Sequence, residues 1–441
     1  MTNTLEIRCL IIQILFSLSI ALFAGLMLSR VAKLLQLPAV TAYLIAGVIL
    51  GPFLIGSLGV PGLGFTSFEE IEHLSIISDV ALGFIAFAIG NEFRLSELKH
   101  IGKQATIIGI LQAVITTIVV DIALIATHFI MPDVLPLPAA IILGAVASAT
   151  APAATLMVVK QYKAKGPVTS TLLPVVALDD AVGLVLFAIS FGVAKAILTN
   201  HIDPVSIIVE PLLEVILSIG LGALMGAIFT YCERFFHSRS KRLAMSVAFV
   251  FITVAISMIK FEVGGVHIGF SSLLSCMMLG TVFCNICDFS AELMDRLDRW
   301  TAPILVLFFV LSGAELDLGV LSSSIIVIIG IVYIVFRCIG KYFGASISAA
   351  IAKSEPNVKK YLGITLFPQA GVALGMAMKA LELGEAGNIV SNIILFSVLI
   401  YELVGPFLTK IALTKAGEIN PQGKTSNRIK DHQRDTHTNK I

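Results

Sequence analysis

The chain has 441 residues, of which 57% are hydrophobic and 13% are charged, and its formal net charge is +1. Soluble domains carry about 25% charged residues, so this composition is that of a membrane protein. The small net charge excludes the basic footprint of a nucleic-acid-binding protein. Six cysteines lie in or beside apolar runs, which argues against a disulfide framework.

Apolar runs that could cross a bilayer recur along the whole chain. A membrane-spanning helix needs about 20 predominantly apolar residues. The first run lacks the small-residue cleavage site of a signal peptide, so it predicts a retained helix. The thirteen predicted helices cover residues 9–29, 38–57, 75–93, 104–130, 137–159, 168–198, 205–232, 243–259, 266–286, 300–318, 324–352, 361–380 and 388–411.

Lysine and arginine residues in the short loops indicate how these helices cross the membrane. Alternate loops hold seventeen of them, whereas the loops between hold three. Because positive residues collect in cytoplasmic loops, this bias predicts an N-terminus outside and a C-terminus in the cytoplasm. The bias keeps its phase along the chain, as expected when no helix has been missed or invented.

The odd number of helices suggests two six-helix halves joined by one connecting helix. If the halves form an inverted repeat, broken helices should recur at matching positions. The fifth predicted helix contains Pro152, and the twelfth contains Pro368-Gln369-Ala370-Gly371. Because proline removes a backbone donor and clashes with the preceding turn, both stretches predict breaks at equivalent positions. If the two breaks cross near the midplane, the ends of their half-helices and their free backbone carbonyls could together bind an ion.

Two adjacent aspartates, Asp179 and Asp180, lie midway along the sixth predicted helix. A charged side chain at the bilayer centre costs roughly 2.5–3.5 kcal/mol on insertion scales, so two in a row need a compensating role. The usual role is a proton or cation site that faces a hydrated cavity. The sequence therefore predicts such a site beside the first break.

Arg337 and Lys341 are basic residues inside the eleventh predicted helix. They are four residues apart and therefore share one helix face. A buried cation beside a buried aspartate is favoured energetically, so we expect one of the two to pair with Asp179. Which one pairs stays open, since Lys341 can instead extend to the cytoplasmic surface.

Other acidic residues lie inside or at the ends of predicted helices. They are Asp79, Glu92, Asp121, Glu315, Asp317 and Glu402. Glu92 fits an interfacial, structural role, and Glu402 fits a role in holding a core helix in place. Glu315 lies at the outer end of the tenth helix, where a solvated surface role is expected. Asp121 is intramembrane and is a candidate supporting residue.

Four features together resemble the monovalent cation:proton antiporter superfamily. They are the stretch from Ser148 to Pro152, the Asp179-Asp180 pair, the basic residue of the eleventh helix and the stretch from Pro368 to Gly371. The likeness covers about residues 9–411. It is greatest to the bacterial sodium/proton antiporters with paired aspartates, which have the NhaA-like fold. The resemblance implies an all-α membrane protein with two broken helices crossing near the midplane of an inverted repeat.

The resemblance also implies a division of labour along the chain. A scaffold would form a dimer interface, and a core would move against it. The predicted parts are scaffold 1–103, core 104–203, linker helix 204–242, scaffold 243–322, core 323–411 and a polar, disordered cytoplasmic tail 412–441. The implied transported ions are protons and a monovalent cation, namely sodium, with lithium and potassium as alternatives. The other implied partners are the lipid of a bacterial cytoplasmic membrane and a second copy of the chain. No cofactor and no nucleic acid are expected.

By the same resemblance, Asp180 would bind the cation, with Thr150 and Ser148 as polar neighbours. Asp179 would pair with the basic residue, and the two aspartates would titrate as a coupled pair. Cation and protons would then compete for one site, and a second proton released from Asp179 would make the exchange electrogenic. Ala151 stands where some relatives carry an aspartate, so no third acidic ligand is assigned.

Alternative functions remain at this stage. A potassium/proton antiporter would have the same fold, and a non-transporting membrane sensor could be built on it. An intramembrane aspartyl protease needs aspartates on two facing helices. Here the two are adjacent, about 100° apart on one helix, which argues against an enzyme of that kind.

Overall fold

The computed structural model describes residues 2–35, 37–60, 62–91, 95–199, 210–236, 238–259, 261–263, 266–287, 289–316, 318–319 and 323–419. Within these ranges, the description leaves out the side chains of residues 2–11, 95–101, 180, 199, 210–211, 261–263, 266–268 and 291. Statements about the fold and its contacts below refer to the described residues.

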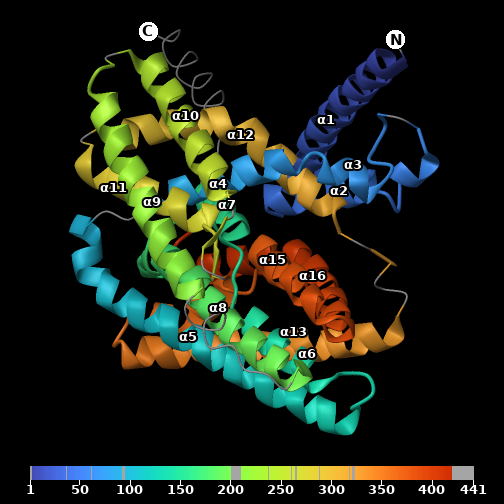
Figure 1. Cartoon of the computed structure of the whole chain (residues 1–441). Helices are drawn as coiled ribbons and strands as arrows, with labels where there is room; N and C mark the ends of the chain where they lie inside the picture. Colours follow the sequence, from blue (N-terminus) through green and yellow to red (C-terminus); the bar gives the residue numbers. More distant parts are fainter. Residues whose placement is uncertain are drawn as a thin grey trace, which may run out of the picture.

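The described chain is almost entirely α-helical (Figure 1). Eight of its helices are long and apolar enough to cross a membrane: α1 (Thr2–Leu34), α5 (Leu95–Ile130), α8 (Pro167–Thr199), α9 (Glu210–Glu233), α10 (Arg239–Ser257), α12 (Ser290–Ala314), α13 (Ser324–Ile351) and α16 (Glu385–Lys415). The shorter helices are α2 (Ala39–Leu50), α3 (Phe68–Glu72), α4 (Ser75–Asn91), α6 (Leu137–Val146), α7 (Pro152–Tyr162), α11 (Ser272–Ile286), α14 (Pro356–Thr365) and α15 (Gly371–Ala380). Two 3₁₀ turns, η1 (Gly56–Leu58) and η4 (Leu381–Leu383), and an antiparallel pair of short strands, β1 (Phe261–Val263) and β2 (Val266–Ile268), complete it.

Each predicted apolar segment contains a helix or a pair of short helices, which confirms the predicted all-α membrane fold. Several boundaries differ. The second helix ends at Leu50 because Gly51 and Pro52 follow it. The ninth predicted helix begins at Ser272, since the residues before it pair as strands.

The last helix is longer than predicted, and the chain beyond it remains ordered as far as residue 419. The carboxylate of Glu418 accepts hydrogen bonds from the backbone N–H groups of Val168 (2.6 Å) and Thr169 (2.8 Å) at the start of α8. An anion is favoured at a helix N-terminus, which explains the order. The predicted disorder therefore does not begin at residue 412, and residues 420–441 lie outside the described chain.

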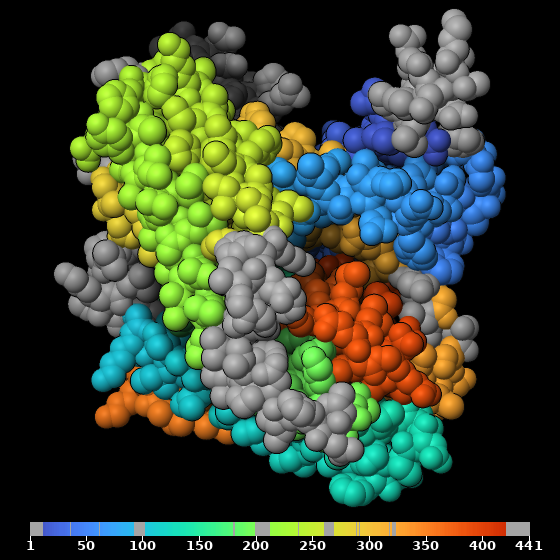
Figure 2. Space-filling view, in the orientation of Figure 1, coloured from blue at the N-terminus to red at the C-terminus, as the bar shows by residue number. Residues whose placement is uncertain are grey.

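The helices pack in two groups. In one group α5 runs along α13, α6 contacts α5 and α8, α14 packs on α13, and α15 packs on α16. In the other group α2 packs on α1 and α12, while α11 packs on α4 and α9. The groups meet where α2 contacts α16 and α7, where α4 contacts α7, and where α8 contacts α9. Figure 2 shows α15 and α16 (red) against the blue segment that contains α2 and α3.

Glycines allow the closest helix contacts of the second group. A Cβ atom on Gly313 of α12 would overlap the backbone of Leu44 in α2, and one on Gly90 of α4 would overlap that of Met277 in α11. Small residues at such crossings are typical of helices packed in a membrane.

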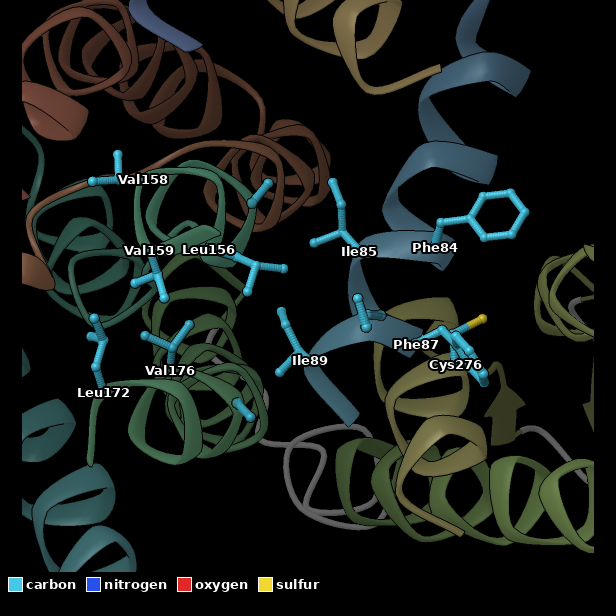
Figure 3. Close-up of a cluster of buried hydrophobic side chains, with 14 of the residues drawn as sticks. Phe84, Ile85, Phe87, Ile89, Leu156, Val158, Val159, Leu172, Val176 and Cys276 are labelled. Carbon is cyan, nitrogen blue, oxygen red and sulfur yellow. The ribbon is translucent and has the colours of Figure 1, made fainter. Parts of the chain in front are cut away.

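Apolar side chains fill part of the contact between the two groups. Ile85 and Ile89 of α4 point toward Leu156 of α7, and Val176 of α8 lies in the same cluster (Figure 3). These four side chains are at most 3% exposed. This part of the contact therefore excludes water.

Candidate functional site

The first break lies between α6 and α7. Helix α6 ends at Val146, and Pro152 begins α7 in its first turn. Proline suits this position because its missing N–H has no helical partner there anyway. Ala151, with φ −81° and ψ 106°, is extended. Residues 147–151 therefore leave backbone carbonyls outside any helix.

The second break lies between α14, which ends at Thr365, and α15, which begins at Gly371. The two breaks touch, because the N–H of Ala151 donates a hydrogen bond of 2.8 Å to the carbonyl of Pro368. A Cβ atom on Gly371 would meet only open space. Backbone groups from two distant parts of the chain therefore meet at one point.

Gln369 joins the second break to the end of α6. Its side-chain N–H donates to the carbonyl of Val146 at 2.9 Å, and its amide exchanges hydrogen bonds with the hydroxyl of Tyr333 from α13. The last carbonyls of a helix lack intrahelical partners. Gln369 thus caps α6 from the opposite half of the protein.

Arg337 of α13 is fully buried, and its guanidinium donates to three backbone carbonyls. Its Nε donates to Ala147 at 3.0 Å and its Nη2 to Ala149 at 2.6 Å. Its Nη1 donates to Phe367 at 2.7 Å. The guanidinium also lies 4.5 Å from the ring centre of Tyr401. Its positive charge therefore offsets the carbonyl dipoles of both breaks at once.

Lys341 and Asp179 form an ion pair of 2.8 Å, and both side chains are fully buried. Lys341 also donates to the hydroxyl of Thr150 (2.9 Å), to the side-chain carbonyl of Gln112 (3.1 Å) and to the backbone carbonyl of Ser148. The carboxylate of Asp179 in turn accepts hydrogen bonds from Thr150 and from the amide of Gln112. Further hydrogen bonds of this kind are what make a buried ion pair tolerable.

The structure brings together most of the residues that the sequence singled out. Asp179, Thr150, Lys341 and the carbonyl of Ser148 share one polar cluster beside the breaks, and Arg337 lies one helical turn away on α13. The hydroxyl of Ser148 bonds to its own helix end, at Ala145, rather than to Asp179. Of the two basic residues, Lys341 pairs with Asp179.

Two predicted site residues fall outside what the structure describes. The backbone of Asp180 continues α8, but its side chain is not described, so its role as cation ligand stays a prediction. Glu92 lies entirely outside the described chain.

Two further predicted residues lie apart from the Asp179 cluster. Asp121 of α5 packs against Gly144 of α6, where any Cβ would overlap its carboxylate, and its buried Oδ1 has no hydrogen-bond partner among the described residues. Glu402 of α16 is 7% exposed, and within the same part of the chain its Oε2 also lacks a partner.

Sequence reasoning missed Gln112 and Tyr333. Gln112 holds both members of the ion pair, and Tyr333 positions Gln369. A signal was available for Gln112, since an amide in the middle of an apolar helix needs a partner there. Tyr333 gave no signal, because a tyrosine is ordinary in an apolar helix.

Two broken helices that cross beside a buried acid–base pair define a class of protein, the secondary transporters with discontinuous helices. The chain belongs to one family of that class. The sequence profile described as "Sodium/hydrogen exchanger, transmembrane" matches residues 18–415. This match covers most of the chain and confirms the antiporter resemblance seen in the sequence.

Characterised relatives are similar over almost their whole length. The chain is 23% identical over 418 residues to "Na(+)/H(+) antiporter NhaS4" of Synechocystis sp., covering 93% of this chain and 98% of that protein. It is also 23% identical over 427 residues to "High-affinity Na(+)/H(+) antiporter NhaS3" of the same organism, covering 89% and 88%.

Solved structures share the fold. The sodium proton antiporter MjNhaP1 from Methanocaldococcus jannaschii at pH 8 superposes with a TM-score of 0.69 at 18% identity, over 92% of this chain and 99% of that one. An electron-microscopy structure of the same antiporter gives a TM-score of 0.72 at 18% identity, over 92% and 98%. At this identity the match supports the architecture.

Proposed function

We propose that this chain exchanges sodium for protons across a membrane by alternating access. Family membership and the names of the two relatives support antiport of these ions. The observation that carries the proposal is the buried pair of Asp179 and Lys341 beside the broken helices. The pair is held by hydrogen-bonding groups from α5 and the first break. Burying two charges inside a membrane protein is costly, and such charges usually mark a transport site.

The contacts of Lys341 suggest how sodium and protons compete. Its ammonium group donates hydrogen bonds to oxygen atoms of Asp179, Thr150 and Ser148. Sodium prefers such hard oxygen ligands. Sodium entry therefore requires Lys341 to give up these contacts, and Asp180 supplies the main cation ligand in this scheme. Proton and cation then exclude each other without a separate coupling device.

The proposed exchange is electrogenic. If Asp180 and the Asp179–Lys341 pair each release a proton when sodium binds, about two protons move per sodium. The transmembrane potential then contributes about 2.3 kcal/mol per charge per 100 mV. In proteoliposomes an imposed potential should change the exchange rate, and a rate that ignores the potential would contradict this stoichiometry.

The arrangement across the membrane forms part of the proposal. Residues 104–203 and 323–411 act as the moving core, and residues 1–103 and 243–322 act as the scaffold, with 204–242 as linker. The bias of loop charges supports an N-terminus outside and a cytoplasmic C-terminus in a bacterial cytoplasmic membrane. A second copy of the chain is the proposed partner of the scaffold.

The direct test is sodium-induced dequenching of a pH dye in everted vesicles. Wild type should respond, and Asp180→Asn and Asp179→Asn should lose at least about 90% of the response, as expected when a group that binds both ions is neutralised. Parallel gradients of sodium, lithium and potassium report the preferred ion. Lys160→Gln, at a partly exposed ion pair with Asp298, serves as a charge-removing control. Full activity in Asp180→Asn would overturn the site.

A further inference from the structure

The last turn of α7 joins the two helix groups through hydrogen bonds. The side-chain carbonyl of Gln161 accepts a hydrogen bond of 2.9 Å from the backbone N–H of Ala39, the first residue of α2. The hydroxyl of Tyr162 donates to the carbonyl of Leu37 at 3.4 Å. Two consecutive residues of α7 therefore hold the segment that begins α2.

The contact with Gln161 supplies a cap that α2 lacks in its own sequence. The first N–H groups of a helix have no intrahelical partner. Pro38 directly precedes α2 and gives it no side-chain hydrogen bond. The acceptor comes instead from the other helix group, and it is lost if α7 moves away from α2. This hydrogen bond therefore depends on how the two groups are arranged.

Two further contacts of α7 close the same side of the molecule. Leu156 of α7 and Ile85 and Ile89 of α4 lie in one apolar cluster, and each is at most 3% exposed (Figure 3). Lys160 forms an ion pair of 2.7 Å with Asp298 of α12, but this pair is partly exposed and therefore contributes little. In the proposed orientation this is the cytoplasmic side, because α7 ends at a lysine-rich loop.

The half-helix that follows the second break, α15, has an open face. Its main contacts are with α16, α6 and α8, which belong to its own group. Gly371 and Gly375 are exposed, and a Cβ atom on either would meet no neighbouring atom of the described chain within 4 Å. Lys379 lies on the same helix face and is also exposed, which favours water over lipid there. In the proposed orientation α15 leads to the outer side.

We propose that Gln161 and Tyr162 form a cytoplasmic latch, which holds the chain in an outward-open conformation. The contrast between the two half-helices carries this proposal. On the cytoplasmic side α7 is bonded to the other helix group, whereas on the outer side α15 presents an open face. The latch has to break before the core can expose the ion site to the cytoplasm, so it presupposes the alternating access of the proposed function.

The test measures accessibility from each side of the membrane. The full chain, with its native cysteines replaced, carries one reporter, either Gly375→Cys on the open face or Leu156→Cys in the closed contact. A charged, membrane-impermeant thiol reagent should label Gly375→Cys readily from outside in right-side-out vesicles. It should label Leu156→Cys only slowly from the cytoplasmic side in everted vesicles.

Breaking the latch should favour the inward-open conformation. A net hydrogen bond shifts an equilibrium by about two- to tenfold. Gln161→Ala combined with Tyr162→Phe should therefore speed the labelling of Leu156→Cys at least about threefold, without faster labelling of Gly375→Cys. Gln161→Glu keeps an acceptor for the N–H of Ala39 and should label like wild type. Lys165→Gln, at an exposed residue just after α7, is the matched control and should have no effect.

The possible outcomes separate the latch from the proposed function. The latch is overturned if Gly375→Cys resists labelling from outside, or if the double variant leaves the labelling of Leu156→Cys unchanged. Faster labelling of both reporters would also overturn it, because that is the signature of a generally loosened protein. A shift of the expected kind in a protein that fails to exchange sodium for protons would retain the latch and refute the proposed function.

Discussion

Breaking the buried ion pair from either side should cost far more stability than breaking an exposed one. Asp179 and Lys341 are both 0% exposed, and each makes further hydrogen bonds inside the cluster. Removing one partner of such a pair leaves a buried charge and costs about 3–5 kcal/mol. We therefore expect Lys341→Met and Asp179→Asn each to lower the free energy of unfolding by that amount. The equilibrium constant for unfolding should then rise at least about 100-fold.

The double variant tests whether the charge imbalance is the cause. With Asp179→Asn and Lys341→Met together, no isolated charge remains, so the loss should be well below the sum of the two single losses. The measurement is unfolding in mixed micelles with a rising fraction of denaturing detergent. The partly exposed pair of Lys160 and Asp298, at 2.7 Å with side chains 29% and 37% exposed, is the matched control. Its disruption should cost only about 0–1 kcal/mol.

The reasoning would be refuted by either of two results. Single variants of the buried pair that lose no more than the Lys160 control would show that the pair is effectively solvated. Strictly additive losses in the double variant would show that the two side chains do not depend on each other.

Three further predictions concern other buried polar contacts. Arg337→Lys should cost about 2 kcal/mol in the same unfolding assay, because one ammonium cannot reproduce the planar fork that binds three carbonyls. Gln112→Leu should cost about 1–3 kcal/mol and change the sodium KM in proteoliposomes, because it leaves both members of the pair with fewer hydrogen bonds. Glu418→Gln should cost about 1 kcal/mol in unfolding, because it weakens the cap of α8, while transport by the folded protein continues.

The fold was largely predictable from sequence because membrane helices depend on local composition. Apolar runs of the required length identify the helices, and Pro152 and Pro368 identify both breaks without any knowledge of tertiary contacts. Helix ends were less predictable. Glu418 becomes ordered by contacting residues about 250 positions earlier in the chain, which no local pattern reports.

The site was only partly predictable, because depth and direction of side chains depend on packing. Arg337 and Lys341 share a helix face. The sequence therefore could not tell which of them pairs with Asp179 and which one binds the backbone carbonyls of the two breaks. Glu315 sits beside a helix end, which in sequence favours a solvated position, yet its side chain is only partly exposed. As a polar residue in an apolar helix, Gln112 could have been predicted to need a hydrogen-bond partner. The sequence could not show that its partners would be Asp179 and Lys341.

The two basic residues of α13 differ in a way that suits different tasks. Arginine stays charged under all ordinary conditions, and its fork holds several acceptors in a fixed plane. Arg337 uses that fork on carbonyls of both breaks, so its charge belongs permanently to the crossing. Lysine can lose its proton when buried, and its ammonium is a point charge that other cations can replace. Lys341 donates to oxygen atoms of Asp179, Thr150 and Ser148. In the proposed exchange, sodium replaces it there, so the exchangeable charge lies one turn from the fixed charge of Arg337.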